Sequence, residues 1–247
     1  MPMKYSWQIL LGLALVAFSM FAYILHYAIF RDGRHILIYL IGDLAFLPVQ
    51  ILFVTLIVDR LLNKREKMAL LKKMNMVIGV FFSELGRSLL ESFKGFDSKA
   101  GDLGKMLLPA AGWTEKDFSE AAARCRAHEL GIELRTGDLE QLRSFLLAKR
   151  DFLVALMENP NLLEHESFTD LLWAVFHLVE ELAVRKDVAL LHEADIRHIV
   201  GDINRAYALL LDQWLAYLAH LKADYPYLYS LAVRLNPFDP DASPGIR

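Results

Sequence analysis

Histidines and acidic residues gather toward the end of the sequence, where together they could bind a transition-metal ion. The densest group surrounds the start of a predicted helix and consists of His192, Asp195, His198 and Asp202. Asp195 and His198 have the carboxylate-x-x-His spacing of di-iron helical bundles, because residues three positions apart project from one helix face. The preceding predicted helix could supply a second set from His177, Glu180 and Glu181. The pattern permits a metal-binding bundle enzyme.

A solvated helix surface explains the same residues more simply. A di-iron bundle needs two Glu-x-x-His motifs and two further glutamates, whereas this sequence has one motif, in an Asp version. Asp195 would stand in the first turn of its helix, where the helix dipole favours an acid. We therefore expect no bound metal and no other cofactor. His177, Asp195 and His198 are the candidate ligands of the alternative.

Other catalytic patterns are missing from the sequence. It contains no Walker loop, Gly-x-Ser-x-Gly elbow or His-Glu-x-x-His motif. The single cysteine, Cys125, lies between Arg124 and Arg126, cations that could lower its pKa. No partner base is evident, so we expect an ordinary thiol. These observations predict a protein that is not an enzyme.

The elements that hold these residues begin with two long apolar runs. Residues 7–30 contain no Asp, Glu, Lys or Arg, and at ~1.5 Å per residue such a helix crosses the ~30 Å hydrocarbon core of a bilayer. Residues 36–58 contain one formal charge, Asp43. The short connection 31–35 predicts a transmembrane hairpin within residues 1–59. A cleaved signal peptide is the alternative for the first run, but its apolar part would span about 7–15 residues.

The charges that flank the hairpin predict its orientation. Basic residues outnumber acids after the second helix, namely Arg60, Lys64, Arg65, Lys67, Lys72 and Lys73 against Glu66. The hairpin loop holds two arginines, Arg31 and Arg34. Because cytoplasmic flanks carry the excess of Lys and Arg, both termini should be cytoplasmic. The same six residues could contact anionic lipid headgroups, as any cytoplasmic flank could.

One stripe of polar residues lies inside the predicted hairpin. Tyr39, Asp43 and Gln50 recur at helical spacing on the second helix. Tyr23 and His26 of the first helix lie at a similar depth, and either could donate a hydrogen bond to Asp43. Such a bond would fix helix packing and contribute about 1 kcal/mol. In the alternative, Asp43 and Gln50 face the pore of an oligomeric ion channel or transporter.

The remaining residues predict an all-α fold, an antiparallel helical bundle. A juxtamembrane helix over 60–94 continues the second apolar run, with a coiled-coil-like seam at Leu71, Met74, Ile78, Phe81 and Leu85 and a stripe of small residues at Gly79, Ser83 and Gly86. The cytoplasmic domain over 95–235 should contain a loop to 112 and then helices over about 114–130, 138–158, 168–185 and 193–223, with a short last helix from 226. Residues 236–247 should form a flexible tail.

Three segments are similar to known sequences. They are residues 42–48 (GDLAFLP), 75–84 (NMVIGVFFSE) and 225–234 (YPYLYSLAVR). These segments and the general layout resemble a family of uncharacterised bacterial inner-membrane proteins. The resemblance implies a bacterial source, and it carries no activity and no site residue.

Together these observations predict a non-enzymatic protein of the bacterial inner membrane. The hairpin would anchor a cytoplasmic helical domain for interaction or sensing, with a possible cytoplasmic protein partner. We expect a homo-oligomer in contact with the lipid bilayer. Nucleic acid is excluded as a partner because the formal net charge of -3 offers a polyanion no attraction.

Overall fold

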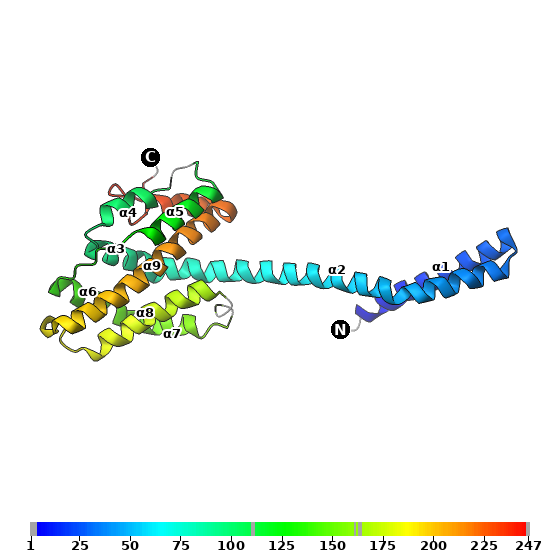
Figure 1. Ribbon diagram of the computed structural model, residues 1–247, viewed down its shortest axis with the longest axis horizontal. Coiled ribbons are helices and arrows are strands. Elements are labelled where there is room, and N and C mark those ends of the chain that lie inside the picture. Colours follow the sequence, from blue (N-terminus) through cyan, green and yellow to red (C-terminus); the bar gives the residue numbers. More distant parts are fainter. Residues whose placement is uncertain (1–3, 110–111, 161, 163–164, 246–247) are drawn as a thin grey trace. The chain divides into compact units, whose positions relative to one another are not determined.

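The computed structural model describes residues 4–109, 112–160, 162 and 165–245, and every regular element in these ranges is helical (Figure 1). The all-α prediction is therefore confirmed. The described chain divides into two compact units, with the boundary between Lys67 and Met68. Helix α2 (Gly33–Phe81) contains this boundary.

The first unit contains α1 (Lys4–Phe30) and the N-terminal part of α2. The chain reverses at Arg31, whose φ of 50° is left-handed. Asp32 then caps α2, because its Oδ1 accepts hydrogen bonds from the backbone N–H groups of Arg34 (3.0 Å) and His35 (3.2 Å). The polar loop residues thus end one helix and start the next.

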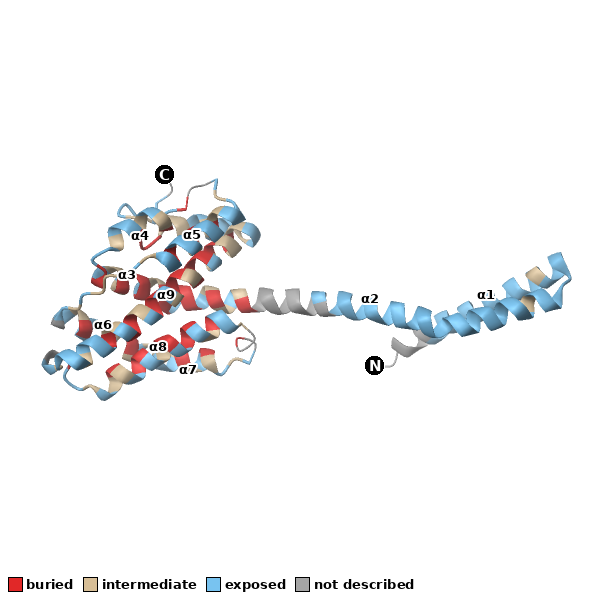
Figure 2. Ribbon diagram, in the orientation of Figure 1, coloured by how far each residue is buried: buried red, intermediate tan, exposed pale blue. Residues whose placement is uncertain are grey.

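Both helices of the first unit are long and apolar enough to cross a membrane. The spans are Ile9–Phe30 and Gly33–Leu62, each with a mean hydropathy of 2.2. None of either span is buried inside the structure, and the pale blue ribbon in Figure 2 shows this exposure along both helices.

The second unit is a helical bundle around one apolar core (Figure 2). Its elements are the end of α2, η1 (Phe82–Gly86), α3 (Arg87–Phe96), α4 (Ala100–Leu107), α5 (Glu115–Ala127), α6 (Thr136–Ala148), α7 (Arg150–Met157), α8 (Glu166–Val184), η3 (Val188–Leu190), α9 (Glu193–Asp224) and α10 (Pro226–Arg234). Helix α9 packs against α3, α5, α8 and α10. Its predicted apolar face is buried from Ile199 through Leu221 apart from the half-buried Tyr217, while Ile196 is exposed.

The predicted juxtamembrane helix is part of this bundle instead of a separate segment. Met74, Ile78, Phe81 and Leu85 are at most 4% exposed and belong to the same core as α8 and α9. The side chain of Leu71 lies outside the described residues. The seam therefore packs within one chain, and its spacing alone could not distinguish this from a coiled coil.

Two predicted boundaries in the bundle differ from the structure. Helix α4 replaces part of the predicted loop, because Leu103 and Leu107 are fully buried and this burial outweighs the glycines beside them. The predicted helix over 138–158 is divided into α6 and α7 at Lys149, whose ψ of 4° departs from helical values. Asp138 lies in the first turn of α6, which begins at Thr136.

The predicted flexible tail begins with packed residues. Asn236 is fully buried and donates a hydrogen bond from Nδ2 to the carbonyl of Leu107 (2.7 Å). Phe238 is 3% exposed, and the carbonyl of Pro237 accepts a hydrogen bond from Lys94 Nζ (2.7 Å). The side chain of Phe238 joins the core, a long-range contact that the Pro-rich composition does not indicate.

Candidate functional site

Two adjacent helices place histidines and acids opposite each other. Helices α8 and α9 pack along one another (Figure 1). Helix α8 carries His177 and Glu181 one turn apart, and α9 carries His198 and Asp202 one turn apart. Residues at i and i+4 share a helix face, so each helix presents one imidazole and one carboxylate to the same place.

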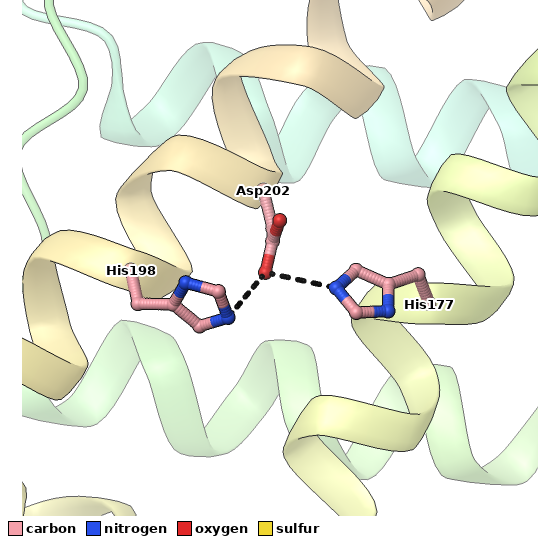
Figure 3. Close-up of side chains that lie close together, drawn as sticks. All are labelled: His177, His198 and Asp202. Carbon is pink, nitrogen blue, oxygen red and sulfur yellow. Dashed lines mark ion pairs between the residues drawn. The ribbon is translucent and has the colours of Figure 1, made fainter.

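Asp202 lies at the centre of this group (Figure 3). Its Oδ2 is 3.5 Å from Nε2 of His177 and 3.4 Å from Nε2 of His198. The Asp202 side chain is 3% exposed, whereas the imidazoles are 45% and 53% exposed. No described residue donates a hydrogen bond to Oδ2. The other oxygen, Oδ1, lies 3.3 Å from Nη1 of Arg205.

Glu181 borders the same group from α8. Its Oε2 lies 3.6 Å from Nε2 of His198, and its Oε1 lies 4.0 Å from Nε2 of His177. Arg185 donates a hydrogen bond to Glu181 Oε2, and this bond is the main reason that the pKa of Glu181 is lowered. Partial burial opposes the shift, and the positive charge of Arg185 adds to it. Glu181 is therefore a carboxylate at neutral pH.

Three of these residues can hold a metal ion. One ligand atom each from His177, His198 and Asp202 lie within 4.8 Å of one another. The structure thus brings together two of the three ligand candidates, His177 and His198. Asp195 lies apart from them, with its Oδ1 3.6 Å from Nη2 of Arg185.

The other acids and histidines of the sequence cluster lie outside the site. Glu180 accepts a hydrogen bond from Arg150 Nε (3.0 Å). His192 is the exposed N-cap residue of α9, without a side-chain capping bond. The sequence signal that could have identified Asp202 as a candidate ligand is its i, i+4 spacing from His198. A search for carboxylate-x-x-His pairs, which are three residues apart, does not find it.

The polar residues of the first unit do not form the expected hydrogen bond. Asp43 is exposed, and no described residue contacts it through a hydrogen bond or an ion pair. The ring of His26 instead stacks on that of His35, with centroids 5.8 Å apart, and the ring of Tyr39 lies 4.7 Å from His35. Tyr23 and Gln50 are also exposed. Asp43 therefore has no partner within one described chain.

The basic residues that predict the membrane orientation all lie on α2. Arg60 and Lys64 are exposed. The side chains of four others lie outside the described residues, namely Arg65, Lys67, Lys72 and Lys73.

The surroundings of Cys125 do not activate its thiol. The side chain is buried on α5, and this burial raises its pKa to about 11 even though Arg124 and Arg126 act in the opposite direction. A thiol with such a pKa holds its proton at neutral pH.

Two family models cover both units of the chain. The model described as "MJ1433, N-terminal helical domain" matches residues 3–62, and the model described as "Uncharacterized protein MJ1433, C-terminal helical domain" matches residues 70–234. The chain belongs to the MJ1433 family. The gap between the two matches contains the boundary between the structural units at Lys67.

A relative from an archaeon supports the same assignment. The chain is 42% identical to "Uncharacterized protein MJ1433" of Methanocaldococcus jannaschii over 233 residues, 94% of each chain. The expected family of uncharacterised proteins with two helical parts is confirmed, whereas this archaeal relative gives no support to a bacterial source. No solved structure matches the chain.

Proposed function

We propose that MJ1433-family chains of this kind are integral membrane proteins in which α1 and α2 anchor a helical domain. The observation that carries this proposal is that no part of the two apolar spans, Ile9–Phe30 and Gly33–Leu62, is buried inside the structure. In water, apolar surface costs about 25 cal/mol per Å², so two long apolar spans that are not buried require an apolar environment. A core helix of a soluble protein satisfies the same requirement by being buried, which these spans are not.

The helical hairpin also argues against a secretory signal. A cleaved signal explains one short apolar segment, whereas α2 supplies a second apolar span after the reversal at Arg31. We place both termini and the second unit in the cytoplasm because Lys and Arg follow the second span. The membrane is then the cytoplasmic membrane of the source cell.

The exposed carboxylate of Asp43 in the first unit supports a homo-oligomer. Asp43 lacks a partner within one described chain, and a carboxylate at membrane depth must face protein or water. A second copy would provide that protein surface. An ion path lined by Asp43 and Gln50 is the second candidate function, and it rests on the same exposure. Whether the hairpins form a packed oligomer or an ion path, the second unit would bind a cytoplasmic partner or sense a cytoplasmic signal.

Membrane fractionation tests the anchoring proposal. The full chain should stay with membranes washed at high pH and enter solution in detergent. A variant with Leu15→Arg and Leu52→Arg should lose this behaviour, because an arginine at a helix centre costs about 2.5–3.5 kcal/mol of insertion free energy. Leu228→Arg on α10, an exposed position of the second unit, is the matched control and should leave the membrane fraction unchanged. Recovery of the unaltered chain in the soluble fraction contradicts the proposal.

A further inference from the structure

We infer that His177, His198 and Asp202 form a binding site for one divalent transition-metal ion of the zinc type between α8 and α9. This departs from the sequence expectation of no metal. It rests on the arrangement of the second unit and is independent of membrane anchoring.

The first argument is the unsatisfied carboxylate oxygen of Asp202. This side chain is 3% exposed, and its Oδ2 receives no hydrogen bond from any described residue. A buried carboxylate oxygen that accepts no hydrogen bond is unfavourable. Arg205 contacts only Oδ1, so Oδ2 is left without a donor among the described residues. A cation between Oδ2 and the two imidazoles would compensate Oδ2.

The second argument is the spacing of the ligand atoms. Zinc forms bonds of about 2.0–2.1 Å to histidine and about 2.0–2.2 Å to carboxylate, so a nitrogen and an oxygen at two corners of a tetrahedron stand about 3.3–3.5 Å apart. Asp202 Oδ2 lies 3.4 Å from one imidazole nitrogen and 3.5 Å from the other. Both nitrogens are Nε2 atoms directed at this oxygen in Figure 3, and in the neutral imidazole such a nitrogen can coordinate an ion.

The third argument is the chemistry of the donor set. Two imidazoles and a carboxylate suit zinc, iron or manganese. Magnesium and calcium prefer oxygen ligands throughout, and only one of the three residues supplies oxygen. The half-exposed imidazoles leave an approach from solvent for the ion.

Glu181 adds a negative charge beside the site. Its two oxygens lie 3.6 Å and 4.0 Å from the same Nε2 atoms that would bind the ion, and Arg185 donates a hydrogen bond to this carboxylate. An outer carboxylate that orients a metal-binding histidine contacts its other ring nitrogen, so Glu181 would act on the bound ion through its negative charge.

A zinc titration of the purified full chain in detergent, after treatment with a chelator, tests this inference. We expect one Zn²⁺ per chain and a melting temperature that rises with the zinc concentration, because an ion that binds the folded state stabilises it. His177→Ala and His198→Ala should each weaken zinc binding by more than about 100-fold, beyond the loss that removal of an outer group causes. Glu181→Gln should weaken zinc binding less than either, because it removes a neighbouring charge and no ligand atom. His192→Ala, an exposed histidine outside the site, is the matched control and should bind like the unaltered chain.

Asp202→Asn provides a separate test of the buried carboxylate. It should abolish zinc binding in a protein whose helical content is retained, and the two histidine variants keep the test decisive if this variant does not fold. Absence of stoichiometric zinc binding overturns the inference. Binding that survives both His177→Ala and His198→Ala overturns it as well. So does a pH-dependent melting temperature without any response to zinc, since protonated imidazoles would then neutralise Asp202.

Discussion

The ring of Tyr217 on α9 lies against Gly79 on α2, where a Cβ built on the glycine would stand 3.5 Å from the tyrosine Oη. The same ring stacks on Phe82, with centroids 4.9 Å apart and ring planes at 15°. The missing side chain at Gly79 thus leaves room for an aromatic residue of the same chain. A Cβ at Gly86 would have much less room than one at Gly79, because it would stand 2.6 Å from Phe82 Cδ1 and 2.7 Å from Phe81 Cε1.

Alanine substitutions at these two glycines should have different effects. Gly86→Ala should lower the free energy of unfolding by about 1–3 kcal/mol, because two packed rings must move. Gly79→Ala should be neutral or stabilising by up to about 1 kcal/mol, since ordinary contact distance is kept and alanine favours the helix. Denaturation of the full chain followed by circular dichroism measures both, and equal losses at the two positions would contradict this packing.

The capping box of α5 gives a pH-dependent prediction. The pKa of Asp117 is lowered, first by the backbone N–H of Thr114 (2.6 Å to Oδ2) and then by the Thr114 hydroxyl (2.7 Å). Because the pKa is lower in the folded state, the stabilisation is complete above the ordinary aspartate value and disappears as the pH falls through the folded value.

Comparison with Asp117→Asn isolates this contribution. The difference in unfolding free energy between the unaltered chain and this variant should stay constant from about pH 7 to 5 and shrink below about pH 4. Glu115→Gln, in the same helix turn but without a capping bond, is the control. An Asp117→Asn difference that grows as the pH falls would contradict the assigned sign.

Cys125 should be almost unreactive in the folded chain. A rise in its pKa from 9.0 to about 11 lowers the thiolate fraction near neutral pH about 100-fold. Alkylation by iodoacetamide at pH 8 should therefore be slow in native protein and reach the ordinary rate in denaturant. Rapid alkylation without denaturant would show that the thiol is accessible and ionised.

Substitutions at Asp43 separate packing from conduction. In a packed oligomer, Asp43→Asn should preserve the oligomer because the amide still forms hydrogen bonds, while Asp43→Leu should weaken association by about 1 kcal/mol. Neither variant should change ion flux in liposomes. A flux in the unaltered protein that Asp43→Asn alters would favour the ion-path alternative.

The elements that local sequence signals define could be predicted. Thr114 followed by Asp117 marks the start of α5, and the structure contains that capping box. The apolar period of α9 extends over its predicted length, and the helix runs from Glu193 to Asp224. Such signals depend on residues within one or two turns, so no tertiary information is needed.

The features that depend on distant contacts could not be predicted. The carbonyl of Leu107, the last residue of α4, accepts a hydrogen bond from Asn236, a residue far along the chain, so the helical state of α4 is not evident locally. The metal-site geometry depends on how α8 lies beside α9, which determines that Asp202 meets both imidazoles while Asp195 meets Arg185. The residue types were recognisable, and their partners were not.

Reporter fusions test the membrane hairpin and its orientation most directly. A reporter that is active only in the cytoplasm should be active when fused after Arg247 and silent when inserted at Gly33, because the basic residues after the second span retain that flank inside. Expression of both fusions at equal levels is the necessary control. Activity at Gly33 with silence after Arg247 would invert the topology, and activity at both positions would contradict a hairpin that crosses the membrane.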